Sequence, residues 1–249
     1  MSDEHPAFSL ATRPADRTVR LGEQASEVYD VWVPSAAIGT TVVLIHGGFW
    51  RARYDRHHLE PLACALARDG FHVANIEFPR VGMPGGGWPA MGQAVASRVE
   101  AVAADPEVPD RLALVGHSAG GHLALWLASA GRSPTVSRVV ALAPAVPLME
   151  VHTRRLSHGA AQELMGCPPE QAPDLWAQAD PDTQRLTTPT TIILGSADTD
   201  VPATMSAGYA ATRRPDEPCT LVEVPGADHF DLIDPGHAAY GLLRRHLPR

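Results

Sequence analysis

The sequence predicts an α/β fold, with one mostly parallel sheet of eight strands, helices on both faces of the sheet and a small cap insertion. Short apolar runs typical of buried strands recur along the 249 residues and, after the first two, alternate with helical stretches. One of these runs, residues 112–115, leads directly into Gly-His-Ser-Ala-Gly at 116–120 and then into a helix. The alternation fails between residues 144 and 188, which predicts the insertion.

The predicted strands follow an irregular start. Residues 1–16 carry Pro6 and Pro14 without periodicity, so they are predicted to be a loose lead-in. A turn near Gly22 joins the first two strands. Residues 41–45 are a continuous β-branched and apolar run, which predicts a central strand buried on both faces. The eight strands are expected at residues 17–21, 27–33, 41–45, 71–78, 112–115, 138–142, 190–194 and 220–224.

Helices are predicted where apolar residues recur at helical spacing or where Gly or Pro closes a helical run. They are expected at residues 58–67, 90–104, 123–130, 156–165, 203–213 and 235–247. Together these elements predict a single domain over residues 1–249. Residues from about 145 to 188 are expected to form a cap over the carboxyl edge of the sheet, not a second domain.

Composition excludes several classes of protein. The formal net charge is −8 and no basic block stands out, which argues against binding to a nucleic acid backbone. Residues 139–149, the most apolar stretch, are too short to span a membrane, and no signal core follows the acidic start. The three cysteines, Cys64, Cys167 and Cys219, match no metal spacing. We expect a cytoplasmic protein with a small-molecule substrate, no membrane partner and no nucleic acid partner; the sequence is compatible with a homodimer.

Ser118 is the candidate nucleophile. It lies between a strand and a helix in the Gly-x-Ser-x-Gly pattern, where a sharp turn exposes the hydroxyl at the end of the sheet. Ala119 opens the helix, so its N–H is unpaired and can face a developing oxyanion. The alternative is a glycine-rich loop with a chance serine.

A serine hydroxyl needs a base, and the base needs an orienting acid. Asp198 follows the strand at 190–194 and is the expected acid; Asp200 competes with it but could instead cap the next helix. His229 follows the last predicted strand and is the expected base. The chain order Ser, Asp, His is that of α/β-hydrolases.

The chain has twelve histidines, and only His229 lies in the loop directly after the last predicted strand. His46 and His117 adjoin tight turns beside the expected site and are interpreted as orienting residues. His72 and His122 fall in a strand and a helix, where a structural role is expected. The remainder are expected at the surface: His5, His57, His58, His152, His158, His237 and His246. No metal-binding spacing of His, Glu or Cys is present, so no metal is predicted.

The segment His46-Gly47-Gly48-Phe49-Trp50 follows the predicted central strand, where a second oxyanion donor belongs. Glycine lets a backbone N–H approach a ligand without a side chain in the way. We therefore expect the N–H groups of Gly48 and Phe49 to join that of Ala119 as an oxyanion hole. The alternative is a tight turn whose aromatic side chains belong to the core.

With these motifs together, the sequence resembles the α/β-hydrolase superfamily from about residue 27 to its end. The segment at 46–50 is similar to the His-Gly-Gly-Tyr-Trp loop of kynurenine formamidases (arylformamidases), with Phe49 in place of the tyrosine. Residues 228–233 are similar to the segment around that family's catalytic histidine. The resemblance implies Ser118, Asp198 and His229 as the triad. It also implies hydrolysis of N-formyl-kynurenine, a reaction of tryptophan catabolism, to formate and kynurenine.

Three functional hypotheses follow. The first is an arylformamidase or amidase that cleaves a small acyl group from an aromatic amine, with Trp50, Trp88, Met91 and His117 expected around the substrate. The second is a carboxylesterase of broad specificity for short acyl groups, which the triad serves equally well. The third is a binding protein without catalysis on the same fold. No cofactor is expected, because the glycine run at 85–87 does not link a strand directly to a helix.

Overall fold

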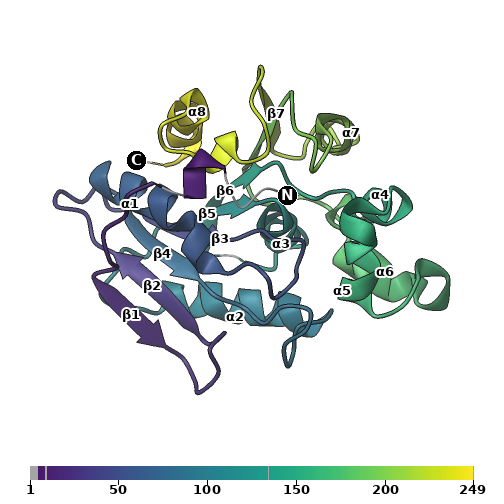
Figure 1. Cartoon of the computed structure of the whole chain (residues 1–249), viewed down its shortest axis with the longest axis horizontal. Coiled ribbons are helices and arrows are strands. Elements are labelled where there is room, and N and C mark those ends of the chain that lie inside the picture. The colour runs from purple at the N-terminus through teal and green to yellow at the C-terminus, as the bar shows by residue number, and fades with distance from the viewer. Residues whose placement is uncertain (1–4, 9, 134, 249) are drawn as a thin grey trace.

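The computed structural model describes residues 5–8, 10–133 and 135–248. One sheet of eight strands runs through it in the order β1-β2-β4-β3-β5-β6-β7-β8 (Figure 1). The strands are β1 (Arg17–Arg20), β2 (Val28–Trp32), β3 (Thr41–Ile45), β4 (His72–Ile76), β5 (Leu112–His117), β6 (Val136–Leu142), β7 (Thr190–Gly195) and β8 (Cys219–Val224). The pairs β1–β2 and β2–β4 are antiparallel and all later pairs are parallel, as the sequence predicts.

The α-helices are α1 (Glu60–Arg68), α2 (Ala90–Ala103), α3 (Ala119–Ala128), α4 (Leu148–Thr153), α5 (Ala160–Met165), α6 (Pro173–Ala179), α7 (Ala203–Ala211) and α8 (Ala238–His246). Six of them lie where helices are expected, and α3 begins at Ala119, as the turn after Ser118 predicts, although its periodic apolar run starts only at residue 123. The helices α4 and α6 of the insertion are not predicted, and α5 begins at residue 160, later than the expected 156.

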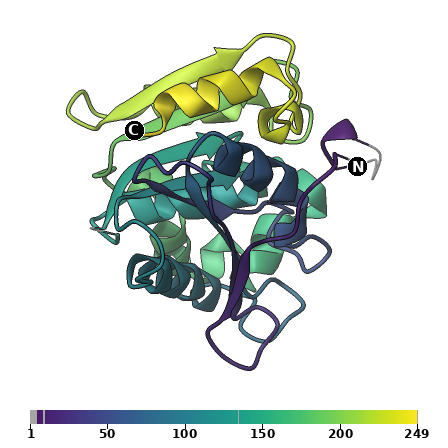
Figure 2. The same ribbon diagram turned by 90° about the vertical axis from the view of Figure 1, so that its left-hand side faces the viewer.

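Alternating side chains of the central strands feed two cores. Val43 and Ile45 of β3 lie in one core with residues of α2 and α3. Val42 and Leu44 lie in the other core, with residues of α1 and α8. The sheet is therefore covered on both faces, as Figures 1 and 2 show. Even β2, whose alternation is imperfect in the sequence, is buried along its whole length for this reason.

The segment between β6 and β7 holds α4, α5 and α6, which lie together at one side of the sheet (Figure 1). A side chain of α3 holds this insertion in place, because Trp126 Nε1 donates to the carbonyl of Gln178 at 2.9 Å. The loop after β3 binds it as well, because Arg51 pairs through Nε and Nη2 with both carboxylate oxygens of Glu163 at 2.6 and 2.8 Å. The insertion is thus attached beside α3 and the loop that follows β3.

The backbones of α3 and β3 approach each other closely in the core. A Cβ atom on Gly120 would lie 2.0 Å from the carbonyl oxygen of Ile45, a distance that side-chain atoms do not reach. The helix that follows Ser118 therefore packs directly against the backbone of the central strand, and residue 120 has room only for glycine.

We expect Gly120→Ala to lower the free energy of unfolding by about 1–3 kcal/mol, because the new methyl group must displace the backbone of β3 or α3. Gly208→Ala in α7 is the matched control, since a Cβ at that exposed helical position meets nothing within 4 Å. That control should be neutral or more stable by about 1 kcal/mol. Urea unfolding of both variants measures the difference, and equal stability of the two would contradict the packing argument.

Candidate active site

Ser118 occupies a strained turn between β5 and α3. Its backbone has φ 56° and ψ −117°, in a region that side chains other than glycine rarely adopt. The turn is held on both sides: the Ser118 N–H donates to the carbonyl of Leu142 at 2.9 Å, and its carbonyl accepts from the N–H of Ala145 at 3.1 Å. Neighbouring strand ends thus hold the serine where the sequence predicts it.

Asp198 and His229 meet across the loops that follow β7 and β8. The Nδ1–H of His229 donates to Asp198 Oδ2 at 2.6 Å, and both side chains are buried. The other oxygen, Asp198 Oδ1, accepts from the N–H groups of Asp200 and Val201 at 2.9 and 2.8 Å. The carboxylate is therefore fixed, and it holds the imidazole in the tautomer whose Nε2 is an acceptor.

Asp200 does not cap the helix that follows it. The N-cap of α7 is Pro202, and no side chain makes a capping hydrogen bond there. Asp200 instead lines the pocket, while Asp198 alone contacts His229. Of the two aspartates in this loop, the structure brings Asp198 to the histidine.

Ser118 and His229 line the same pocket. Among the described residues, no hydrogen bond joins the Ser118 hydroxyl to the His229 ring. Catalytic hydrogen bonds in a free enzyme are often long and tighten when substrate binds. The arrangement brings the expected nucleophile, base and acid to one pocket.

The loop after β3 passes directly beside the serine. A Cβ on Gly47 would lie 3.0 Å from Ser118 Cβ. Gly48 has φ +105°, and a Cβ there would lie 2.7 Å from Cβ of Tyr54, so this position also requires glycine. Within the described chain, the N–H groups of Gly48 and Phe49 donate to no protein acceptor. They are available to an oxyanion at the position that the sequence analysis assigns to them.

The pocket over Ser118 is small and largely aromatic. Its cavity volume is about 20 Å³, well below the range typical of small-molecule sites. Its lining comes from the loops after β3, β5, β7 and β8 and from the turn before α1. The lining residues are Gly48, Phe49, Tyr54, His58, His117, Ser118, Asp200, His229 and Phe230.

Three residues expected around the substrate lie elsewhere. Trp50, Trp88 and Met91 are nearly fully buried in the core beside α2 and α3 and do not line this pocket. The rings of Trp50 and His122 are 5.3 Å apart and those of Trp88 and Trp126 5.0 Å apart. For Trp50 the reason is the left-handed backbone of its loop: Phe49 (φ 47°) faces the pocket, and the next residue, Trp50 (φ 59°), turns into the core.

The cap insertion contributes no residue to the lining of this pocket, because none of residues 145–188 belongs to it. The insertion is attached to Trp126 of α3 and to Arg51 of the loop after β3, and the pocket is lined by the shorter loops. The pocket is walled instead by residues whose importance the sequence analysis missed, namely Tyr54, His58 and Phe230. The one available signal was their position, since Phe230 adjoins His229 and the other two shortly follow the Gly-Gly loop.

His117 and His58 face the pocket as neutral rings. Burial, and then the charges of His229 and His58, lower the pKa of His117 well below its usual value. Its Nε2–H donates to the carbonyl of His229 at 3.0 Å, since a carbonyl can only accept. Burial and then the charge of His46 lower the pKa of His58 to about 3. His117 thus links the turn of the nucleophile to the loop of the base.

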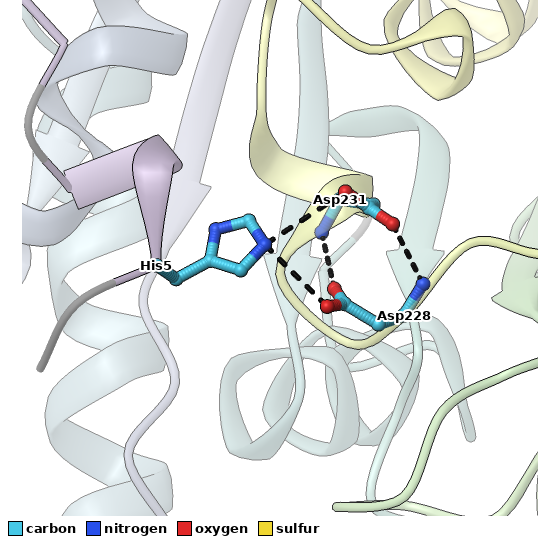
Figure 3. A group of neighbouring side chains, drawn as sticks. All are labelled: His5, Asp228 and Asp231. Atoms are coloured by element: carbon cyan, nitrogen blue, oxygen red, sulfur yellow. Dashed lines mark hydrogen bonds and ion pairs between the residues drawn. The ribbon is translucent and has the colours of Figure 1, made fainter. Parts of the chain in front are cut away.

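A second group of titratable side chains lies on the outer side of the His229 loop (Figure 3). His5 Nε2 lies 3.5 Å from Asp228 Oδ2 and 3.7 Å from Asp231 Oδ1. These three residue types could bind a metal ion. However, His5 Nδ1 accepts the N–H of Ala7 at 3.1 Å, so the neutral ring carries its proton on Nε2. In this state Nε2 is a donor toward the carboxylates and not a metal ligand.

The two carboxylates also close the turn that carries His229. Asp228 Oδ1 accepts from the N–H groups of Phe230 and Asp231 at 2.8 and 2.9 Å, and Asp231 Oδ2 accepts from the N–H of Asp228 at 2.8 Å. The His5 ring lies 5.5 Å from the Phe230 ring. His5, predicted to be an ordinary surface residue of a loose lead-in, therefore packs on the back of a pocket residue.

We expect stability to fall as the pH falls below about 6. In the unfolded chain a histidine takes up a proton near pH 6.5, whereas burial lowers the folded pKa of His58 to about 3 and that of His122 to about 4. The unfolded chain then binds more protons between about pH 6 and 4, and each such histidine contributes up to about 1.4 kcal/mol per pH unit. Urea unfolding as a function of pH measures the slope. His122→Gln should reduce this slope and exposed His57→Gln should not; equal slopes would refute the assignment.

Among the helices of the described residues, none has the length and apolar character that crossing a membrane requires.

Several solved structures share this fold. Esterase B from Lactobacillus rhamnosis superposes with a TM-score of 0.74 at 18% identity, over 94% of this chain and 85% of that one. An acetyl ester-xyloside bifunctional hydrolase from Caldicellulosiruptor lactoaceticus gives 0.72 at 19%, over 93% and 94%. A truncated carbohydrate esterase from gut microbiota gives 0.71 at 20%, over 87% and 91%. No curated protein sequence is significantly similar to the chain.

The sheet order, the nucleophile turn and the loop positions of Asp198 and His229 are those of a serine hydrolase with the α/β-hydrolase fold. The sequence model of the BD-FAE family matches residues 29–212. This span includes the oxyanion loop, Ser118 and Asp198, and it covers well over half of the 249 residues. The chain therefore belongs to the BD-FAE family.

Proposed function

We propose that the protein is a serine esterase that hydrolyses short-chain carboxylic esters through an acyl-enzyme on Ser118. The observation that carries the proposal is the buried Asp198–His229 pair, joined at 2.6 Å and opening onto the same pocket as Ser118. The names of the structural neighbours, which include an esterase B, a carbohydrate esterase and an acetyl ester-xyloside hydrolase, support ester hydrolysis.

The reaction proceeds in two steps. Ser118 Oγ attacks the ester carbonyl carbon while His229 Nε2 takes the hydroxyl proton, and Asp198 stabilises the imidazolium that forms. The C–O bond to the alcohol then breaks, and His229 returns the proton to the departing oxygen. Water repeats the sequence on the acyl-enzyme, giving the acid and free Ser118.

The oxyanion of each tetrahedral intermediate needs donors already in place. The N–H groups of Gly48, Phe49 and Ala119 fill this role in the proposal. Within the described residues, none of the three donates to a protein acceptor outside its own element. Each such donor is worth about 3 kcal/mol, or about 10²–10³ in rate.

The pocket supports a short acyl group. Its cavity volume of only about 20 Å³ favours a small acyl group over a long one. The neutral rings of His58 and His117 and the carboxylate of Asp200 add polar character to one part of the lining. A lining with both aromatic and polar side chains fits a short acyl ester of an alcohol that carries further hydroxyl groups, such as an acetylated sugar.

Arylformamidase activity is the second candidate. The observation that favours it is the aromatic lining of Phe49, Tyr54 and Phe230, which suits the flat aromatic amine of N-formyl-kynurenine. A formyl group is also the smallest acyl group that the pocket could hold. The catalytic steps are the same, with an amine as leaving group in place of an alcohol.

We expect kcat/KM to be highest for p-nitrophenyl acetate and to fall with acyl chain length. N-formyl-L-kynurenine should be a poorer substrate. Ser118→Ala should lower kcat by about 10⁴-fold or more, because the remaining groups cannot form an acyl-enzyme. Steady-state kinetics on this series measures the preference, and a higher kcat/KM for the formamide would assign the second function.

A fluorophosphonate probe should label the wild type and not Ser118→Ala; an unlabelled wild type would indicate a binding protein.

Asp198→Asn and Asp200→Asn form a matched pair in one loop. Asp198→Asn should lower kcat by about 10⁴-fold with an unchanged fold, because the amide can no longer hold the His229 tautomer. Asp200→Asn should act on KM and change kcat by less than about tenfold, since Asp200 lines the pocket without contacting His229. The same esterase assay separates them. Equal losses in kcat would remove Asp198 from its assigned role.

A further inference from the structure

A buried ion network lies directly behind the oxyanion loop. His46, the first residue of that loop, is fully buried, and its Nε2 lies 2.9 Å from Oε1 of Glu77, which is 2% exposed. Glu77 lies just after β4, next to β3 in the sheet. The second ring nitrogen, His46 Nδ1, lies 2.9 Å from the carbonyl oxygen of Gly47.

Both partners of the His46 ring are acceptors. The Gly47 carbonyl has no proton to donate, so Nδ1 must carry one. Glu77 Oε1 already accepts the N–H of Phe78 at 2.9 Å, and Oε2 accepts the N–H of Arg56 at 3.2 Å. A carboxylate surrounded by donors is ionised, so the proton between Glu77 and His46 belongs to His46. Both ring nitrogens then carry a proton.

The wider surroundings agree with an ionised Glu77. Burial alone raises the pKa of its carboxyl, but the hydrogen bond from His46, the charges of His46 and Arg80 and the Phe78 N–H bring that pKa below its usual value. Arg80 Nη2 lies 3.5 Å from Oε1. Arg56 Nη1 lies 3.8 Å from Oε2, and Arg56 Nε pairs with Asp30 at 2.5 Å.

The bond to the Gly47 carbonyl also sets the direction of a donor. The carbonyl of Gly47 and the N–H of Gly48 belong to one peptide group, and in a trans peptide they point in opposite directions. Holding the carbonyl against His46 therefore directs the Gly48 N–H away from His46. Gly48 lines the pocket of Ser118 on that other side.

We propose that His46 is a positioning residue: a buried imidazolium, kept protonated by Glu77, that holds the Gly47 carbonyl and so aims the Gly48 N–H at the oxyanion. The catalytic part of this proposal rests on the esterase function above. Its physical reason is that a glycine pair allows the peptide group to rotate almost freely, so one side chain has to select the productive orientation. A neutral His46 with its proton on Nε2 would release the Gly47 carbonyl.

Titratable groups from three further elements face this ring, its partner Glu77 or the arginines beside them. They are Arg56 and His58 from the segment before α1, Asp30 from β2, and Arg80 from the loop after β4. His58 is neutral, because its pKa is lowered to about 3, and so it does not compete for Glu77. Arg56 pairs with Asp30 and lies near Glu77 Oε2, while Arg80, the Phe78 N–H and His46 Nε2 surround Oε1.

The first test is the protonation state itself, read from the ¹⁵N NMR signals of the ring in the wild-type protein. At about pH 8, where an exposed imidazole is neutral, both nitrogens of one buried histidine should show the shift of a protonated nitrogen. His46→Gln identifies this signal by losing it. A His46 ring with one unprotonated nitrogen would overturn the proposal, whatever the activity.

The second test is kinetic, with two isosteric variants of one network. Glu77→Gln should remove the doubly protonated signal. It should also lower kcat for p-nitrophenyl acetate by about 10- to 1,000-fold with little change in KM, and the largest loss corresponds to the loss of one oxyanion donor. Asp30→Asn removes a buried carboxylate that contacts Arg56 but not His46, so it should keep the signal and most of kcat. Thermal unfolding confirms that both variants are folded at the assay temperature.

The two proposals fail separately. If Glu77→Gln retains the wild-type kcat, or if both variants lose kcat equally with the NMR signal intact, the positioning role of His46 is wrong and the esterase stands. If the wild type shows the doubly protonated ring but hydrolyses no ester, the esterase function falls. The wild-type spectrum decides the protonation state even where Glu77→Gln does not fold.

Discussion

The parallel pairing of β3 with β5 is the constraint on which the rest of the site depends. In its register Ile45 lies opposite Gly116, so the two strands end side by side and their loops leave the sheet together. One loop carries Gly48 and Phe49, the proposed oxyanion donors, and the other carries Ser118. Because Gly120 packs against the Ile45 carbonyl, the spacing between them is fixed by backbone contact and not by adjustable side chains.

The remaining residues of the site follow β7 and β8, which lie toward the opposite edge of the same sheet from β1. The loops after β7 and β8 supply Asp198 and His229, and His117 bonds across the gap to the His229 carbonyl. Each catalytic group is therefore held by a hydrogen bond to a neighbouring loop. Such preorganisation is what a serine hydrolase needs, since donors that are already oriented require no rearrangement when charge develops.

Much of this arrangement could be predicted from the sequence, because strands, turns and nucleophile motif depend on local residue patterns. Residues 41–45, for example, form a strand with the predicted bounds, and Ser118 occupies the predicted turn. The pocket walls could not be predicted in the same way. Whether Phe49 or Trp50 faces the pocket depends on a pair of residues with left-handed backbone, and His58 reaches the pocket through the packing of the turn before α1. The contact between His46 and Glu77 joins residues thirty-one positions apart, which no local pattern predicts.

The contact between His5 and Phe230 has a practical consequence for making the protein. Whatever precedes residue 5 in a polypeptide, including an affinity tag, must depart from a point beside the turn that carries His229 (Figure 3). The last described residues follow α8. A tag at the amino end is therefore joined close in sequence to a residue that packs against Phe230, whereas a tag at the carboxyl end is joined beyond α8.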